Sequence, residues 1–406
     1  MPYHYNYKVM SSIVQNSNLQ NVLNCVYKME SPTRARIAQR LGLSRTALTS
    51  LVNESFELDL LSEKETEEHK NGRPGVILSP NTTSWFACGA SFDQNTWSFV
   101  ILNLLGEVVY RRQVQIDPDP IKTVSSDYAV SCLVDTLPSV LQQCPGKLLP
   151  MIGIGVPGFI DKEQGMIEYA SDLGWRNVRI SKAVEDAIGL PVTILNRHMT
   201  SGLAESRIGA GIHTKDMVYL GISTGLIACN FSDGDFLIGS NYNLGEVGHT
   251  IIDPYGTRCS CGKKGCLQAV ASQTALCNNI RSHYGDSWPF SSFTPSLEEI
   301  YDIATNNPDS ICAKELSVTI RYIGILCSNL FNLFNPDRIV IGGPVSILFK
   351  ERLLDELESV IAEFVVPHHF EKSMIRTSTL QTWGSPIGSA FLVLDNALSL
   401  VSKNIQ

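Results

Sequence analysis

Apolar residues recur at helical spacing in three short stretches of the N-terminal part of the chain. Residues 18–29 predict a first helix with one apolar face. Residues 33–41 predict a second, with Ser31-Pro32 as its start signal and Gly42 as its stop. A third extends from Ser44, a suitable N-cap residue, through residue 61. The residues expected to face inward are Leu19, Val22, Leu23, Val26 and Tyr27 in the first helix and Leu48, Leu51 and Val52 in the third.

The turn between the second and third helices is Gly42-Leu43-Ser44, which is typical of a helix-turn-helix. The following segment, LLSEKETEEHKNGRPGVILSP, predicts a strand, a polar tip and a second strand, which together form a wing. Residues 79–81 (Ser-Pro-Asn) are a candidate hinge. We therefore expect residues 1–80 to fold as a winged helix-turn-helix domain.

The pattern changes after the hinge. Apolar runs such as FACGASF, WSFVILNL and MIGIGVPGFI predict buried strands. They alternate with helical stretches at 124–144 and 345–366. This alternation predicts an α/β fold, and 406 residues are enough for two or three domains.

The composition adds limits on location and cofactors. The chain is 44% hydrophobic and 18% charged, as in ordinary globular proteins. It has no run of about 20 apolar residues and no secretory signal, so we expect a cytoplasmic protein without a membrane span. Three of the 11 cysteines crowd together at 259–266, which indicates metal binding under reducing conditions and not a disulfide framework.

Charge is distributed unevenly along the chain. The formal net charge is −8, which argues against nucleic-acid binding over the whole surface. Residues 1–50, however, carry six basic side chains and one acidic side chain, Glu30. The basic residues are Lys8, Lys28, Arg34, Arg36, Arg40 and Arg45. A local basic segment on an acidic protein is typical of one small DNA-binding domain.

The third helix of a helix-turn-helix enters the DNA major groove, so its early residues are the candidate base readers. These are Ser44, Arg45, Thr46, Thr49 and Ser50. Arg34 and Arg36 are candidate phosphate contacts, and Arg73 on the wing is a candidate minor-groove contact. The expected partner is a double-stranded DNA operator. A protein-interaction module is the alternative, because the wing also carries Glu63, Glu65, Glu67 and Glu68.

His249, Cys259, Cys261 and Cys266 lie close together in GEVGHTIIDPYGTRCSCGKKGCL. Three thiolates and one imidazole match a closed structural zinc site, in which four protein ligands leave no open position for catalysis. Gly262 and Gly265 allow the chain to turn tightly between the ligands. Zinc is therefore the expected cofactor, and four reduced side chains without a metal are the alternative.

Four motifs in order, GIGVPGFID, LGEVGH, CSCGKKGCL and FNPDRIVIGG, resemble the ROK family of bacterial repressors and sugar kinases. The helix-turn-helix and GRPG wing ahead of them resemble the repressor branch. The resemblance implies an actin-like, ribonuclease-H-like pair of α/β lobes with a sugar cleft between them. We assign residues 81–196 to the first lobe and 197–406 to the second lobe with its zinc site.

The chain departs from the kinases of this family at three places. In their D-x-G-x-T-like phosphate turn, Ser91 replaces the Asp and Asp93 replaces the Gly. The second phosphate turn, residues 223–228, lacks its later glycine. Arg197 replaces the catalytic Asp, and a guanidinium cannot act as a base near neutral pH. We therefore expect no enzymatic activity, with a sugar kinase carrying an appended head as the alternative.

The family's sugar contacts map onto Gly158, Asn196, Glu246, His249 and Gln268 of this chain. Gln268 stands where the family has Glu, and it can still hydrogen-bond hydroxyl groups. Arg197 indicates either an anionic sugar ligand or an internal salt bridge, for example to Asp172 or Glu205. Trp175 either packs on a sugar ring or belongs to the core.

Together these features predict a transcriptional repressor of carbohydrate metabolism, controlled by a sugar or sugar phosphate. Repressors with a helix-turn-helix bind DNA as dimers, so self-association to a dimer or tetramer is expected. Control by a protein partner is an alternative, with the amphipathic C-terminal residues 386–405 either a docking helix or a packed terminal helix. A protein-interaction adaptor that does not bind DNA is a further alternative.

Overall fold

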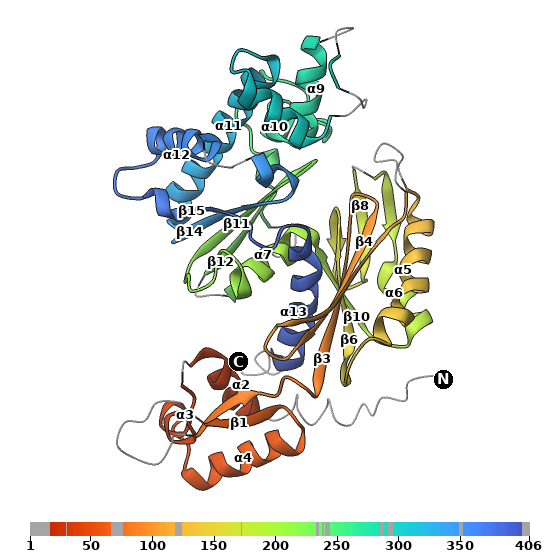
Figure 1. Cartoon of the computed structure of the whole chain (residues 1–406), viewed down its shortest axis with the longest axis vertical. Helices are drawn as coiled ribbons and strands as arrows, with labels where there is room; N and C mark the ends of the chain where they lie inside the picture. Colours follow the sequence, from red (N-terminus) through yellow and green to blue (C-terminus); the bar gives the residue numbers. More distant parts are fainter. Residues whose placement is uncertain are drawn as a thin grey trace.

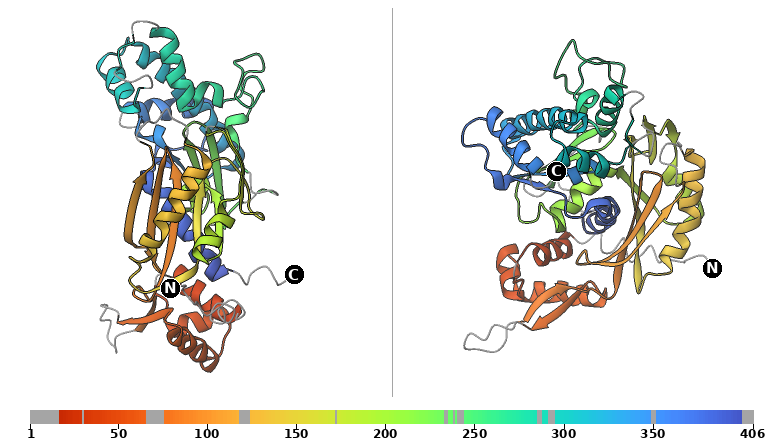
Figure 2. Two further views of the ribbon diagram at one scale, coloured as in Figure 1. Left: turned by 90° about the vertical axis from the view of Figure 1, so that its right-hand side faces the viewer. Right: turned by 45° about the horizontal axis from the view of Figure 1, so that its top comes forward.

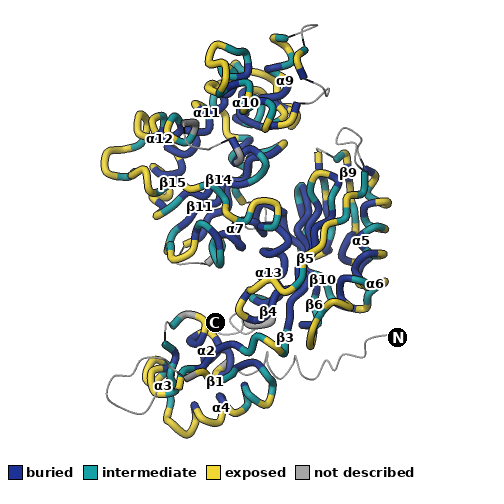
Figure 3. Tube along the Cα trace, in the orientation of Figure 1, coloured by how far each residue is buried: buried dark blue, intermediate teal, exposed yellow. Residues whose placement is uncertain are grey.

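The computed structural model describes residues 17–29, 31–65, 76–117, 124–171, 173–232, 235–237, 239, 244–284, 288–290, 295–348 and 352–399. Figure 1 shows three parts along the long axis: a small N-terminal head, a first α/β lobe and a second α/β lobe. Long stretches of both central sheets are buried, whereas the outer side of the head is largely exposed (Figure 3).

The head contains the expected three helices, α2 (Ser17–Lys28), α3 (Arg34–Leu41) and α4 (Arg45–Glu57). The side chain of Thr33, not the Ser31-Pro32 pair, caps α3. Helix α4 ends at Glu57, before the predicted residue 61, because Asp59 has φ +58° and turns the chain. Leu60 and Leu61 then enter the core as the chain leads into the wing. The wing strands β1 (Leu61–Glu65) and β2 (Val76–Pro80) pair antiparallel.

The first lobe is built on a five-stranded sheet in the order β10-β6-β3-β4-β5. Strands β6 (Lys147–Val156) and β10 (Val192–Asn196) run parallel to β3 (Trp85–Asp93). Strand β4 (Thr96–Asn103) pairs antiparallel with β3 on one side and with β5 (Val108–Gln115) on the other. Helices α5 (Ser126–Leu141) and α6 (Ile180–Ile188) cover one face (Figure 1). A small sheet of β7 (Phe159–Asp161), β8 (Met166–Ala170) and β9 (Trp175–Val178) follows β6.

The second lobe repeats the plan with the sheet order β13-β12-β11-β14-β15. Its strands are β11 (Met217–Ile222), β12 (Leu226–Ser232), β13 (Asp235–Phe236), β14 (Arg338–Gly342) and β15 (Ile375–Thr377). Its helices are α8 (Gln268–Ala271), α9 (Gln273–Tyr284), α10 (Leu297–Asn306), α11 (Ile311–Phe334) and α12 (Arg352–Phe364). Two α/β lobes confirm the predicted fold class.

Among the described residues, α11 is the one helix long and apolar enough to cross a membrane by length and composition alone. More than half of its most apolar window is buried. Leu316, Ile320, Ile323 and Phe331 of α11 belong to the core of the second lobe. The apolar character of this helix is therefore explained by packing within the lobe.

Helix α13 (Gly384–Ser399), at the end of the described chain, returns to the first lobe and packs against its sheet and α7 (Arg197–Ile208). Figure 2 shows α13, in dark blue, between the two lobes. The contact is close because a Cβ on Gly153 of β6 would lie 1.9 Å from the carbonyl oxygen of Ser389. A glycine is thus required where α13 crosses β6. The domain boundaries at 80 and 196 remain predictions.

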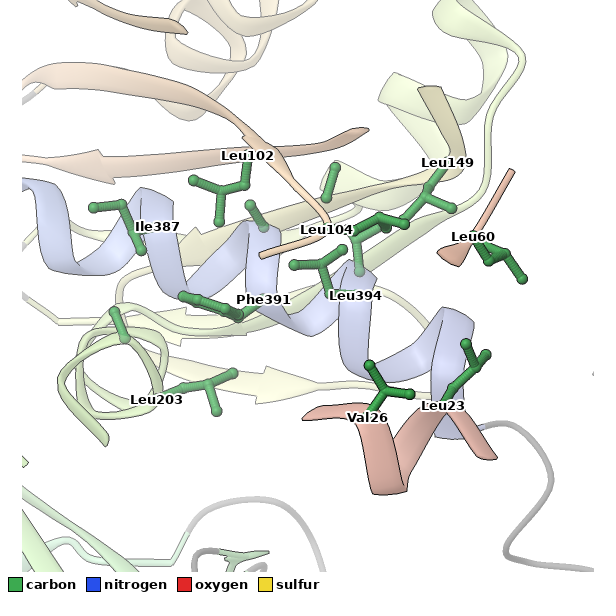
Figure 4. Close-up of a cluster of buried hydrophobic side chains, with 14 of the residues drawn as sticks. Leu23, Val26, Leu60, Leu102, Leu104, Leu149, Leu203, Ile387, Phe391 and Leu394 are labelled. Carbon is green, nitrogen blue, oxygen red and sulfur yellow. The ribbon is translucent and has the colours of Figure 1, made fainter. Parts of the chain in front are cut away.

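The head packs directly against the first lobe and α13. The Tyr27 hydroxyl donates to the carbonyl oxygen of Leu104 at 2.8 Å, and Trp85 Nε1 donates to that of Leu58 at 2.8 Å. Figure 4 shows Leu23, Val26 and Leu60 of the head in one apolar cluster with Phe391 and Leu394 of α13. The candidate hinge is therefore not a free linker: Asn81 N–H donates to Leu60 O at 2.9 Å.

Candidate DNA-reading face, metal cluster and ligand cavity

Helix α4 presents the predicted base readers on its outer side. Ser44, Arg45, Thr46, Thr49 and Ser50 are all exposed, whereas Leu48 between them is buried. The Ser44 hydroxyl accepts from the N–H of Ala47 at 3.2 Å, so Ser44 serves as the N-cap. Gly42, with φ +65°, ends α3 in the left-handed conformation that glycine favours. The local sequence thus positions an exposed polar helix face next to a tight turn.

The predicted phosphate contacts are partly engaged within the head. Arg34 forms a salt bridge to Glu63 of β1 at 2.9 Å, so one of the wing's acidic residues is neutralised. Arg36 is exposed and donates to the carbonyl oxygen of Ser31 at 3.2 Å. Arg73 lies outside the described residues. Because the Arg34–Glu63 pair is exposed, it is weak and can exchange for a phosphate.

The four predicted metal ligands lie together. His249, Cys259, Cys261 and Cys266 each offer one ligand atom, and all four atoms lie within 4.8 Å of one another. Cys261 Sγ is 3.7 Å from Cys266 Sγ, and Cys259 Sγ is 3.8 Å from His249 Nδ1. A backbone hydrogen bond from Lys263 lowers the pKa of the Cys261 thiol, which favours the thiolate that binds metals. This cluster could hold a metal ion.

A cavity of about 530 Å³ lies between the two lobes, bordered by the metal loop. Its lining includes all six residues predicted to bind a ligand: Gly158, Asn196, Arg197, Glu246, His249 and Gln268. They come from the β6–β7 turn, the β10–α7 junction, the loop before the cysteine cluster and α8. The volume is within the usual range for small-molecule sites.

The lobe-one wall of this cavity is fixed by Asn196. Its side-chain Nδ2 donates to the carbonyl oxygen of Gly158 at 3.0 Å, and its Oδ1 accepts from the N–H of His198 at 2.9 Å. Gly158 has φ +86°, and a Cβ there would lie 2.3 Å from the carbonyl oxygen of Tyr169. This glycine therefore lets β7 turn close to β8.

The lobe-two wall carries Gln268 and Glu246. Gln268 Oε1 would lie 3.1 Å from a Cβ on Gly248 and 3.3 Å from one on Gly225, so two glycines make room for the amide. Burial raises the pKa of Glu246 to about 7. Burial also lowers the pKa of His249. The wall therefore offers an amide, a carboxyl and an imidazole to a ligand.

Arg197 forms a salt bridge with Asp93 at 2.8 Å, and its side chain is only 9% exposed. It also donates to the Ser223 hydroxyl at 3.4 Å. Asp93 ends β3 and Ser223 follows β11, so one guanidinium joins the ends of these two strands. The sequence left an anionic ligand and an internal salt bridge open for Arg197, and it did not identify Asp93 as the partner.

The other suggested partners of Arg197 have different outcomes. Asp172 lies outside the described residues. Glu205 is fully buried and is occupied elsewhere, because it accepts from Leu380 N–H at 3.0 Å and from the hydroxyl of Ser378. Trp175 belongs to the core: it stacks on Phe92 with ring centroids 5.1 Å apart and donates to Val124 O.

Sequence reasoning missed His198 and Ser223 on the cavity floor. Burial, and then the charge of Arg197, lower the pKa of His198 to about 3, so its imidazole is neutral. Its Nε2 lies 3.1 Å from the Ser223 hydroxyl. A histidine directly after Arg197 carries no periodic signal, and only the packing of α7 against β11 reveals the pair.

Two α/β lobes around a polar cavity, joined to an N-terminal head of three helices and a two-stranded wing, define this chain as a protein with an actin-like fold. Residues 94–396 match the ROK family, and the chain belongs to that family. The four motifs that suggested the family all lie within the matched residues.

Three of the similar proteins are named as transcriptional repressors or regulators. The chain is 28% identical to the xylose repressor of Caldicellulosiruptor bescii over 400 residues, covering 96% of this chain and 98% of that protein. It is 24% identical to the xylose repressor of Bacillus subtilis, again over 96% and 98%. It is 25% identical to the DNA-binding transcriptional dual regulator NagC of Escherichia coli, over 86% and 85%.

Solved structures agree on the fold. A ROK family transcriptional regulator, described as a homolog of the E. coli MLC protein, superposes with a TM-score of 0.78 at 25% identity, covering 96% of this chain and 97% of that one. A ROK hexokinase from Thermus thermophilus superposes with a TM-score of 0.65 at 22% identity, covering 77% of this chain and 99% of its own. The hexokinase shows that the two lobes share the kinase fold.

Proposed function

We propose that this chain is a sugar-responsive transcriptional repressor of carbohydrate genes, located in the cytoplasm. One observation carries the proposal: the same chain has an exposed polar helix face on its head and a polar cavity between its lobes. The two xylose repressors named above match this chain over both parts, because each match covers 96% of this chain and 98% of the repressor. Double-stranded DNA is the partner of the head, and a sugar is the ligand of the cavity.

The proposal includes the loss of phosphoryl transfer. By the family resemblance, Arg197 stands at the position of the kinase base, and a guanidinium cannot accept a proton from a sugar hydroxyl. Its contacts with Asp93 and Ser223 also join the ends of β3 and β11, the segments that resemble the kinase phosphate turns. Both features support a binding protein over a kinase.

Zinc is the metal we propose for the cysteine cluster. A tetrahedral zinc ion about 2.3 Å from each sulfur requires sulfur atoms about 3.8 Å apart. The observed 3.7 Å between Cys261 and Cys266 fits this requirement. His249 also lines the cavity, so the metal would fix the orientation of one ligand-binding side chain. Zinc would cross-link residues 249–266, and its four protein ligands would leave no open coordination position for catalysis.

The C-terminal helix does not favour control by a docked protein partner. The apolar residues Ile387, Val393 and Leu394 of α13 are buried against the first lobe and the head. The packing of these residues explains the amphipathic pattern, and it favours the interpretation of residues 386–405 as a packed terminal helix. Residues 400–406 lie outside the described part of the chain.

A gel-shift titration tests the proposal. The protein is titrated on its own upstream DNA and on a scrambled duplex of equal length, without sugar and with xylose, glucose or N-acetylglucosamine. We expect preferential binding to the upstream duplex and a change in affinity with one sugar. Equal affinity for both duplexes would contradict DNA-sequence recognition, and no response to any of the three sugars would contradict control by a monosaccharide in the cavity.

A further inference from the structure

The cavity extends beyond the residues that map onto the family's sugar contacts. Its lining continues from Gln268 to Ser223 and Thr224 on the β11–β12 turn and to Thr274, Asn278 and Asn279 on α9. Thr274 and Asn278 are four residues apart on one face of α9, and both are exposed. At the helical rise, they extend the wall by about 6 Å along the helix.

This second part of the wall is polar and uncharged. The hydroxyl of Thr274 and the carboxamides of Asn278 and Asn279 on α9 can each both donate and accept hydrogen bonds, whereas the Ser223 hydroxyl already contacts Arg197 and His198. Such groups match the hydroxyls of a sugar, which also donate and accept. They can donate to a phosphate as well, but they carry no charge to compensate that of the anion, as cations and metal ions do.

The cations near the cavity do not alter this character. Within the described lining, the arginines are Arg197 and Arg258, and no lysine is present. Arg197 is neutralised by Asp93 at 2.8 Å. Arg258 lies next to Cys259 on the metal loop and not on α9. The α9 end of the cavity is therefore a neutral site.

The start of α9 is also closed to anions. The N–H of Gln273, the first residue of α9, donates to the carbonyl oxygen of Ser223 at 2.9 Å. The Ser272 hydroxyl accepts from the N–H of Ala275 at 3.1 Å. Two of the backbone N–H groups that would otherwise attract a phosphate at a helix N-terminus are thus already bonded within the protein.

We propose that Thr274 and Asn278 form a second sugar subsite, so that the ligand is a neutral disaccharide or longer oligosaccharide. One sugar unit lies against Asn196 and Gln268, and the next lies against α9. This inference rests on the proposed function, because it assumes that the cavity binds a sugar. In this proposal, the second sugar ring lies where a kinase of this family would hold the phosphates of its nucleotide.

Calorimetry on the full-length protein tests the subsite with matched pairs of ligands. The pairs are xylose with xylobiose, glucose with cellobiose, and N-acetylglucosamine with its β-1,4-linked dimer; glucose 6-phosphate is the anionic probe. We expect one disaccharide to bind at least about ten-fold more tightly than its monosaccharide. Equal affinities within every pair, or tightest binding of the sugar phosphate, would overturn the subsite.

Two variants separate the subsite from the rest of the cavity. Because Asn278 is exposed on α9, Asn278→Ala is expected to fold, to leave the monosaccharide Kd unchanged and to remove most of the disaccharide advantage. Gln268→Ala is expected to weaken both members of a pair equally. An unchanged advantage in Asn278→Ala refutes the subsite while leaving sugar control intact. Binding of no sugar by the wild type, although the operator is bound, refutes sugar control itself and the subsite with it.

Discussion

At the scale of single residues, Arg197 and Asp93 belong together. Each replaces a residue on which kinase chemistry depends, and each compensates the charge of the other at 2.8 Å. A guanidinium that is 9% exposed requires a carboxylate, whereas Asp93 is 42% exposed and remains partly hydrated. Their pairing could not be predicted from the sequence, because the two residues are 104 positions apart and no local pattern connects them.

A double-mutant cycle measures this pair. Arg197→Ala, Asp93→Ala and the double variant are unfolded in urea, and we expect a coupling free energy of about 1–2 kcal/mol, since the pair is half-buried. Lys182 and Asp186 provide a matched control, because they pair at 3.0 Å but are both 65% exposed. Their coupling should not exceed about 0.5 kcal/mol. Additive effects of Arg197→Ala and Asp93→Ala would show that the two charges do not stabilise each other.

The cysteine cluster gives the second residue-scale prediction. Purified protein should contain about one zinc per chain, and Cys261→Ser should lose the metal and lower the melting temperature, because metal binding energy is also folding energy. Cys132→Ser is the control, since Cys132 is a free thiol on α5, outside the cluster. Elemental analysis and thermal unfolding provide the readouts. A Cys261→Ser protein that retains its zinc would refute the ligand assignment.

At the scale of elements, the sequence predicted what local rules determine. The three head helices follow from apolar spacing, from Ser44 as a cap and from Gly42 as a stop. The end of α4 was wrong by four residues, because Leu58, Leu60 and Leu61 continue the apolar pattern while the positive φ of Asp59 breaks the helix. The two sheets were predicted as buried strands, but their order depends on pairing between distant segments.

Helix α4 carries the third prediction. Arg45→Ala should cost about 1–3 kcal/mol of affinity for the preferred operator and relax discrimination at one base position, because a bidentate contact with guanine is lost. Arg112→Ala removes the same charge from exposed strand β5 of the first lobe and should leave DNA binding unchanged. Fluorescence titrations on operator and scrambled duplexes measure both. If Arg45→Ala binds both duplexes as the wild type does, α4 is not the reading helix.

At the scale of the whole molecule, α13 connects the cavity region to the head. Near its start, Ser385 hydrogen-bonds Thr200 of α7 at 2.8 Å and Ser91 of β3 at 2.5 Å, next to the Arg197 and Asp93 turns. Near its end, Leu394 packs in one cluster with the head (Figure 4). The sequence suggested residues 79–81 as a hinge, which remains a prediction; two hydrogen bonds cross this segment, from Trp85 Nε1 to Leu58 O and from Asn81 N–H to Leu60 O.

This arrangement leads to the last prediction. A ligand that changes the packing of α7 and α13 can alter DNA binding only if the head is fixed to them, and Tyr27 supplies one such fixing contact through its hydroxyl to Leu104 O at 2.8 Å. Tyr27→Phe removes that hydrogen bond and keeps the ring. We expect it to retain sugar and operator binding but to reduce the factor by which sugar changes operator affinity.

The measurement is the ratio of operator Kd with and without saturating sugar. Tyr128→Phe is the control, because Tyr128 is 59% exposed and lies on α5 of the first lobe, whereas Tyr27 lies on the head; Tyr27 was expected to face inward but is 37% exposed. Loss of one partly buried hydrogen bond should lower stability by about 1 kcal/mol at most, so the variant remains folded for the comparison. An unchanged ratio in Tyr27→Phe would mean that this contact between the head and the first lobe does not transmit the effect of the sugar to the operator. The effect would then reach the DNA by another route, such as rearrangement of two subunits.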